Sequence, residues 1–144
     1  MPDPTCIFCK IVAGEIPAIR VHEDDRTIAF MDINPANPGH VLVVPRGHAP
    51  DLYAMPADDL AACALTAQRV ARAVRRAVTP EGVNLVQANG PGAAQSVMHF
   101  HVHVLPRFQG DDLKLNWGLT PGDLEAISEM AEKIRDAMAA SDAT

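Results

Sequence analysis

The chain has 144 residues, of which 48% are hydrophobic and 21% charged, and its formal net charge is −6 at pH 7. This length can bury a core without disulfide support, so we expect a single domain over residues 1–144. The negative balance argues against a nucleic-acid partner, which needs clustered basic side chains. Since no apolar run approaches about 18 residues and no secretion signal is recognised, we expect a cytoplasmic protein without a membrane partner.

The N-terminal part of the chain predicts a short helix followed by three strands. The helix lies in "IFCKIVAGEIP" and ends at Gly14 and Pro17. The segments "AIRVHE" and "TIAFMD" flank the turn-forming "EDDR", which predicts a hairpin. "NPANPG" predicts a loop, because its prolines and glycine suit neither a sheet ladder nor a helix interior. "HVLVVP" then predicts a buried strand.

The remainder predicts two longer helices and two more strands. From Asp58 to about Val78 the apolar residues recur at helical spacing, with arginines on the remaining surface. "VNLVQA" and "HFHVHVL" predict strands that the loop "NGPGAAQ" separates. A helix-start pattern at Thr120 precedes an apolar stripe and predicts a C-terminal helix over about residues 120–139. The sum is an α+β domain with about five mostly antiparallel strands.

Three of the six histidines stand at alternate positions in "HFHVHVL". On a strand, His99, His101 and His103 share one face while the apolar residues between them face the core. Three interpretations follow: independent solvated histidines, a metal site, or catalysis in which one imidazole attacks an electrophile. Three histidines on one flat strand do not easily converge on a single ion. The preceding "NGPGAAQS" is either a plain turn or a loop that holds phosphate oxygens, and beside the histidines it favours phosphorus as the electrophile.

The cysteines divide into a pair and a single residue. Cys6 and Cys9 form a CxxC pair, which in a reducing compartment indicates metal or redox chemistry more often than a structural disulfide. Two such ligands do not complete a tetrahedral zinc site. Cys63 lies in an apolar helical pattern and is predicted to belong to the core.

The order His, apolar, His, apolar, His, apolar, apolar in "HFHVHVL" resembles the histidine triad (HIT) superfamily. The resemblance extends to "CIFCKIVAGEIPA", "DINPANPGHVLVVPRGH" and "NLVQANGPGAAQSVMHFHVHVLPR", in the family's order over roughly residues 6–107, and is strongest to the bacterial Hint/HIT-like hydrolases. It implies a HIT-like fold, a purine nucleotide or nucleotide conjugate as partner, and no organic cofactor. It also implies a homodimer, formed through the long helix and the sheet edge at "VNLVQA".

The resemblance assigns roles to individual residues. His101 matches the nucleophile that forms a nucleotidyl-histidine intermediate, and His103 matches the histidine that binds phosphate oxygens. His99 matches a supporting histidine, and His40 the fourth histidine of the site. The implied nucleotide contacts are three apolar residues around the base, a ribose-binding carboxylate, and uncharged donors of the phosphate loop: Phe8, Ile11, Ile33, Asp32, Asn89, Gln95 and Ser96. Alternatively, the apolar three are ordinary core residues and the carboxylate caps a turn.

A structural zinc is also implied by the resemblance. Similar chains with a CxxC pair complete the site with the histidine after "VVP(K/R)" and the first triad histidine, here His48 and His99. We therefore expect zinc on Cys6, Cys9, His48 and His99, where it ties the N-terminal helix to the histidine strand. The alternative is a pair of free thiols.

The preferred function is hydrolysis at the α-phosphate of adenosine or guanosine 5′-phosphoramidates. The alternatives are a diadenosine polyphosphate hydrolase and a nucleotide-binding regulatory protein whose catalysis is incidental. The presence of His101 favours an enzyme, since binding alone does not require a nucleophile. Two departures from the family pattern, Ala88 in place of asparagine and Ala94 in place of glycine, bear on substrate preference.

Overall fold

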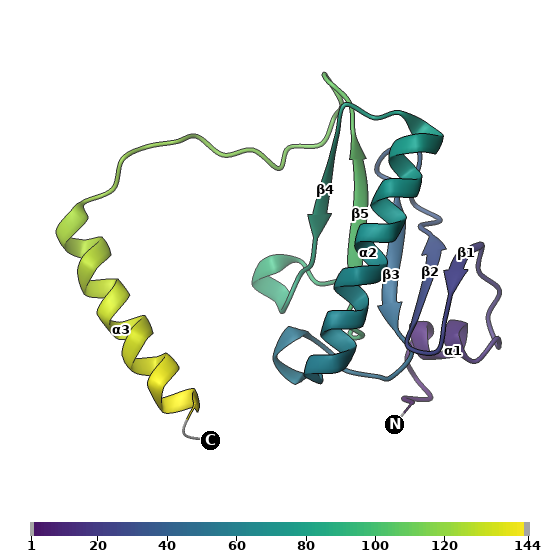
Figure 1. Ribbon diagram of the computed structural model, residues 1–144, viewed down its shortest axis with the longest axis horizontal. Coiled ribbons are helices and arrows are strands. Elements are labelled where there is room, and N and C mark those ends of the chain that lie inside the picture. Colours follow the sequence, from purple (N-terminus) through teal and green to yellow (C-terminus); the bar gives the residue numbers. More distant parts are fainter. Residues whose placement is uncertain (1, 143–144) are drawn as a thin grey trace. The chain divides into compact units, whose positions relative to one another are not determined.

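The computed structural model describes residues 2–142 and divides into two compact units, one ending at Leu113 and the other beginning at Lys114 (Figure 1). The first unit contains a sheet with two helices, and the second contains one helix. The single domain expected over residues 1–144 stays a prediction. Within residues 2–142, no helix has both the length and the apolar character needed to cross a membrane.

A five-stranded antiparallel sheet with strand order β1-β2-β3-β5-β4 forms the first unit, which confirms the predicted α+β class. The predicted hairpin is present between β1 and β2, where the Asp24 carboxylate accepts hydrogen bonds from the backbone N–H groups of Arg26 and Thr27. The strand bounds are β1 Arg20–Glu23, β2 Thr27–Met31, β3 Val41–Pro45, β4 Gly82–Val86 and β5 Val102–Arg107.

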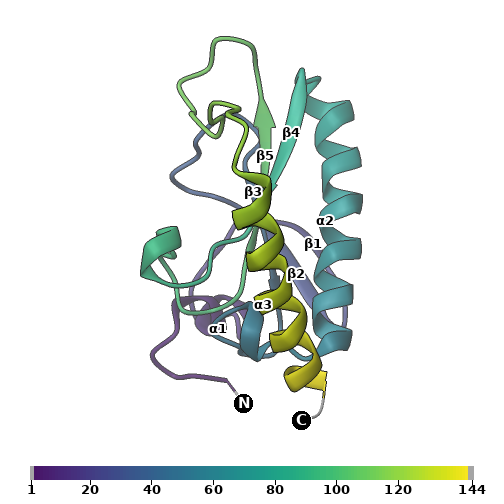
Figure 2. The same cartoon turned by 90° about the vertical axis from the view of Figure 1, so that its left-hand side faces the viewer.

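The two faces of the sheet are covered by different helices (Figure 2). Helix α2, Ala57–Val78, packs on one face with Val41 and Val43 of β3. Helix α1, Ile7–Val12, packs on the other face with Leu42 and Val44, the intervening residues of the same strand. The side-chain alternation of an extended strand thus explains why "HVLVVP" is apolar throughout: both faces of β3 are buried.

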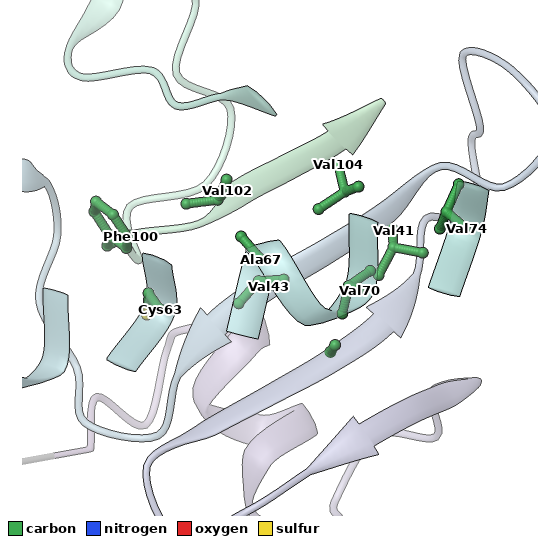
Figure 3. Close-up of a cluster of buried hydrophobic side chains, with 10 residues drawn as sticks. Val41, Val43, Cys63, Ala67, Val70, Val74, Phe100, Val102 and Val104 are labelled. Atoms are coloured by element: carbon green, nitrogen blue, oxygen red, sulfur yellow. The ribbon is translucent and has the colours of Figure 1, made fainter. Parts of the chain in front are cut away.

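The histidine segment departs from the prediction that all of "HFHVHVL" is a strand. The ladder of β5 begins at Val102 and continues through Arg107, so residues 99–101 precede it. The partner strand explains this start: Pro45 lies two residues beyond Val43, the partner of Val102, and has no N–H to donate to a ladder. The predicted alternation persists, because Phe100, Val102 and Val104 all pack in the cluster beneath α2 (Figure 3).

The second unit contains α3, Leu124–Asp142, instead of the predicted helix over residues 120–139. Its first turn follows Asp123, whose carbonyl accepts from the Ile127 N–H and whose carboxylate accepts from the Glu125 N–H. The later start follows from this use of Asp123, whose carboxylate and carbonyl both accept from N–H groups of the first turn. Two short 3₁₀ turns complete the described elements, Leu52–Ala54 and Pro91–Ala93.

Candidate active site and metal-ligand cluster

A cleft of about 380 Å³ lies on the α1 face of the sheet, within the size range of small-molecule sites. One part of its wall comes from apolar side chains of α1 and β2, and polar side chains stand at the ends of the strands. It gathers most of the residues predicted for the nucleotide site: Phe8, Ile11, Asp32, Ile33, Ser96, His101 and His103.

The apolar residues of this wall are divided between core and surface. Phe8 and Ile11 are buried in the α1 cluster and also line the cleft, so a core position and a ligand contact are compatible for both. Ile33 is 81% exposed and is not a core residue. Asp32 lines the cleft while its Oδ1 accepts from the Asn34 N–H at 2.8 Å, so it also forms the turn of the alternative interpretation.

The His101 ring is held by a backbone acceptor. Its Nδ1 lies 2.8 Å from the carbonyl oxygen of His99, and a carbonyl only accepts, so Nδ1 carries the proton and donates. The neutral ring therefore has its lone pair on Nε2. Phe8 packs edge-on against this ring, with centroids 5.2 Å apart. A buried imidazole with a free Nε2 lone pair in a ligand-sized cleft can act as a nucleophile.

His40 fixes the opposite arrangement on His103. The Ala36 N–H donates to Nδ1 of His40 at 3.1 Å, so the neutral His40 ring carries its proton on Nε2. That Nε2 lies 2.9 Å from Nδ1 of His103 and donates to it, which leaves His103 protonated on Nε2. An Asp32 carboxylate oxygen lies 3.5 Å from the same His40 nitrogen. The cleft therefore presents a hydrogen-bond acceptor on His101 and a donor on His103, and His40 sets the proton position of His103.

Burial keeps both members of the His40–His103 pair neutral. Burial, with a smaller contribution from the neighbouring His101 and His40, lowers the pKa of His103 to about 4, and Asp32 opposes the shift. Burial also lowers the pKa of His40, against the attraction of Asp32. At pH 7 both rings are uncharged, as the assigned proton positions require.

We expect the free energy of unfolding to fall as the pH is lowered from about 6.5 to about 4, partly because of His103. The unfolded chain takes up a proton on this histidine near pH 6.5, whereas the folded chain does so only near the lowered pKa, so protons favour unfolding across this window. Urea denaturation of the wild type and of His103→Asn at several pH values tests this. The wild type should lose stability more steeply than the variant, and equal slopes would contradict the assignment.

The loop before the histidines is closed by its own side chains. Gln95 Oε1 accepts from the Gly90 N–H at 2.8 Å, and its Nε2 donates to the Pro50 carbonyl at 2.6 Å. Asn89 Oδ1 accepts from the Leu52 N–H at 2.7 Å. Neither side chain is among the residues that line the cleft, so the contacts predicted between these two amides and phosphate stay predictions. Their observed contacts fix the loop against residues 50–52.

Ala94 in this loop adopts the left-handed region, with φ 59° and ψ 39°. An L-residue in this conformation is strained by roughly 1–2 kcal/mol. Glycine relieves the strain, but it also raises the backbone entropy of the unfolded chain, which offsets part of the gain in stability. We expect Ala94→Gly to raise the free energy of unfolding by about 0.5–1 kcal/mol in urea denaturation. The neighbouring Ala93→Gly, at ordinary φ, should lower it. If both variants are destabilised equally, the strain at Ala94 has no energetic consequence.

Four potential metal ligands meet where α1 approaches the chain segments that follow β3 and precede β5. Cys6 is the N-cap of α1 and Cys9 lies inside that helix, while His48 and His99 come from the two segments. The four ligand atoms all lie within 4.8 Å of one another. We call Cys6, Cys9, His48 and His99 the thiol–imidazole cluster. These are the four residues expected to hold zinc.

The chemistry of the thiol–imidazole cluster fits a zinc ion. Nε2 of His99 donates to the Pro45 carbonyl at 2.9 Å, so its Nδ1 bears a lone pair, which faces Nδ1 of His48 at 3.3 Å and Sγ of Cys6 at 3.4 Å. The backbone N–H of Asp3 donates to Sγ of Cys9, and the backbone N–H of Cys9 donates to Sγ of Cys6. Two sulfur and two nitrogen donors form a set that zinc commonly binds in tetrahedral structural sites.

Sequence reasoning missed the backbone groups that set the proton positions. The Ala36 N–H and the Pro45 carbonyl determine which nitrogens of His40 and His99 are protonated, and no side-chain pattern reports them. It also missed Phe30, which is buried beside Phe8 at 5.5 Å and lines the cleft. Its alternation with Ile28 in β2 is the signal that could have placed it on the α1 face.

Comparison with known proteins gives consistent matches. A family model described as the HIT domain matches residues 13–110. The chain is 41% identical over 135 residues to Protein hit of Bacillus subtilis, covering 89% of this chain and 92% of that protein. It is 37% identical over 131 residues to adenosine 5′-monophosphoramidase hnt1 of Schizosaccharomyces pombe, covering 90% and 96%. The crystal structure of a Zn-bound histidine triad family protein from Mycobacterium smegmatis is 40% identical, with a TM-score of 0.73 over 81% of this chain and 84% of that one.

Proposed function

Because this chain belongs to the HIT family and is at that level a nucleotide hydrolase, we propose that it hydrolyses purine nucleoside 5′-phosphoramidates or related AMP and GMP conjugates. The observation that carries the proposal is the pairing, in one cleft, of an unprotonated Nε2 on His101 with a protonated Nε2 on His103. A nucleophile beside a hydrogen-bond donor is what attack on a phosphate ester or amide requires. The monophosphoramidase name of the fission yeast relative supports the choice of a phosphoramidate.

The proposed reaction has two steps, formation of a nucleotidyl-histidine and its hydrolysis. Nε2 of His101 attacks the α-phosphorus, the bond from phosphorus to the leaving nitrogen breaks, and a nucleotidyl-histidine forms. The leaving nitrogen takes a proton from the Ser96 hydroxyl, which solvent replaces. Water then attacks the same phosphorus and gives up one proton to solvent, the bond from phosphorus to Nε2 of His101 breaks, and a nucleoside monophosphate leaves with the neutral ring restored. Nε2–H of His103 donates to a phosphate oxygen in both steps.

The remaining cleft residues bind the nucleoside. The base lies against Phe8, Ile11 and Ile33, and the ribose hydroxyls donate to the Asp32 carboxylate. Asp32 is held in place for this by its contacts with the Asn34 N–H and with His40, so it does not need to reorganise on binding.

A panel of substrates tests the proposed reaction. Adenosine and guanosine 5′-phosphoramidates should be hydrolysed to the monophosphates faster than diadenosine polyphosphates. The reverse order would favour the diadenosine polyphosphate hydrolase. Nucleotide binding without turnover of any substrate would overturn the enzymatic function and favour a regulatory nucleotide-binding protein.

We also propose that the thiol–imidazole cluster holds a structural zinc. The donor set of Cys6, Cys9, His48 and His99 supports this, as does the zinc-bound relative from Mycobacterium smegmatis. The ion would supply a cross-link between α1 and the segments beside β3 and β5. The free-thiol alternative has less support, because it gives no reason for two thiols and two imidazoles to place their ligand atoms within 4.8 Å of one another.

A homodimer is the last part of the proposal. Strand β4 stands at the edge of the sheet, and its Leu85 side chain is exposed, as an interface residue would be in a separated subunit. Light scattering at micromolar concentration should give the mass of two chains, and Leu85→Lys should shift it toward one. Val21→Lys, at the opposite edge strand, should leave the mass unchanged. A monomer mass for the wild type would refute the dimer.

A further inference from the structure

The thiol–imidazole cluster and the cleft share one residue, His99. Its ring belongs to the cluster, and its main-chain carbonyl accepts the hydrogen bond from Nδ1 of His101 at 2.8 Å. We propose that His99 is a positioning residue, through which a zinc ion in the cluster fixes the orientation and the proton position of the His101 ring. This inference rests on the proposed function, because it concerns the nucleophile of that reaction.

The bond from His101 to the His99 carbonyl decides whether the nucleophile is available. Within residues 2–142 it is the one polar contact that the structure assigns to the His101 ring. When it holds, the proton sits on Nδ1 and Nε2 has its lone pair. When it is lost, the proton can move to Nε2 and the ring can rotate, and either change removes the attacking lone pair from the phosphorus.

Strand pairing does not hold the backbone that carries this carbonyl. Residues 99–101 precede the ladder of β5, so other contacts must set their position. The Phe100 N–H donates to the Ala49 carbonyl at 2.7 Å, and these two residues directly follow His99 and His48. Two cluster ligands therefore flank the hydrogen bond that joins their segments. A metal held between the two rings would stabilise the same junction.

Phe8 provides a second connection between the cluster and the nucleophile. It lies between Cys6 and Cys9 in α1, and its ring packs edge-on against both His99, with centroids 5.8 Å apart, and His101, at 5.2 Å. Any displacement of α1 when the cluster opens would therefore change the wall against which the His101 ring is packed. Both connections run from the cluster to the same ring.

Removal of zinc from the wild-type protein tests the inference. The protein is loaded with Zn²⁺, treated with a chelator, and reloaded, and circular dichroism confirms that it stays folded. Long-range proton–nitrogen NMR reports the proton position on the His101 ring without any substrate, with the signal assigned by its absence in His101→Asn. Single-turnover mass spectrometry then gives the rate of nucleotidyl-histidine formation.

We expect zinc removal to convert the single Nδ1–H form of His101 into a mixture, and to slow adduct formation by about 10- to 100-fold with little change in KM. Reloading should restore both. Cys9→Ala should behave like the chelated protein. Cys63→Ala, which removes a buried thiol from the opposite face of the sheet, should lower the thermal midpoint while keeping the ring signal and the rate.

A His101 ring that keeps its single Nδ1–H form in folded, zinc-free protein would overturn the inference. Should chelation unfold the chain, the same measurement is made on His48→Asn, which removes one ligand and keeps both thiols, with its zinc content and fold determined by metal analysis and circular dichroism. Failure of the proposed function is distinguishable, because a wild type that forms no adduct would still report through the NMR signal whether zinc orients the ring.

Discussion

Replacement of His101 by asparagine is expected to lower turnover of a nucleoside 5′-phosphoramidate by about 10⁴-fold or more, as removal of a nucleophile or its base does in other covalent mechanisms. The amide cannot attack phosphorus, and the remaining residues cannot replace it. Affinity for AMP should stay near that of the wild type, because the base, ribose and phosphate contacts assigned to the other cleft residues are kept. Steady-state kinetics and calorimetric titration with AMP measure the two quantities.

The chain offers a matched control for this substitution. His22 lies on β1 away from the cleft residues, and its ring pairs with the Asp24 carboxylate at 2.9 Å. His22→Asn should therefore retain wild-type turnover. Turnover of His101→Asn comparable with that of the wild type would contradict the role of His101 as nucleophile. A loss of AMP affinity equal to the loss of turnover would instead favour a role in binding.

Removal of zinc is expected to lower the thermal midpoint by about 10–15 °C, from a linked stabilisation of about 4 kcal/mol at a thousandfold excess over the dissociation constant. The physical reason is the position of α1. This helix has six residues, too few to be stable alone, and it supplies Cys6 and Cys9 to the thiol–imidazole cluster. Metal analysis should give one zinc per chain, and calorimetric scans with and without a chelator measure the midpoint.

A core thiol separates loss of the metal from loss of packing. Burial raises the pKa of the Cys63 thiol to about 12, and this residue packs beneath α2, away from the thiol–imidazole cluster. Cys63→Ala should lower the thermal midpoint but keep full zinc content, whereas Cys6→Ala should have both a lower thermal midpoint and less bound zinc. Two results would refute the proposal of a structural zinc. One is purified, folded protein that lacks stoichiometric zinc, and the other is an equal thermal midpoint with and without the chelator.

The fold could be predicted from the sequence where a local pattern of residues is compatible with one type of secondary structure. The turn at Asp24 follows from a carboxylate that accepts nearby backbone N–H groups, and α2 follows from its apolar stripe. The start of β5 could not be predicted, because it depends on Pro45 in a strand more than fifty residues earlier in the chain. Non-local pairing sets the ends of strands, whereas local patterns indicate only that a strand exists.

The candidate site was predictable in its membership more than in its chemistry. Motif resemblance selected the histidines and the cysteines, and the structure brings them into a cleft and a cluster. Which nitrogen of His101 or His103 carries the proton depends on the His99 carbonyl and on His40, contacts that arise only after folding. The amides of Asn89 and Gln95 illustrate the converse: their side-chain type suggests a ligand contact, yet their hydrogen bonds close the loop.

In the proposed reaction, His101 forms a covalent bond to the α-phosphorus of a nucleotide. Intact-mass analysis of the wild type, quenched within a single turnover of adenosine 5′-phosphoramidate, tests it most directly. We expect a mass increase of one nucleoside monophosphate unit, which peptide mapping places on His101 and which is absent in His101→Asn. Turnover with no adduct in the wild type, or an adduct on another residue, would contradict it.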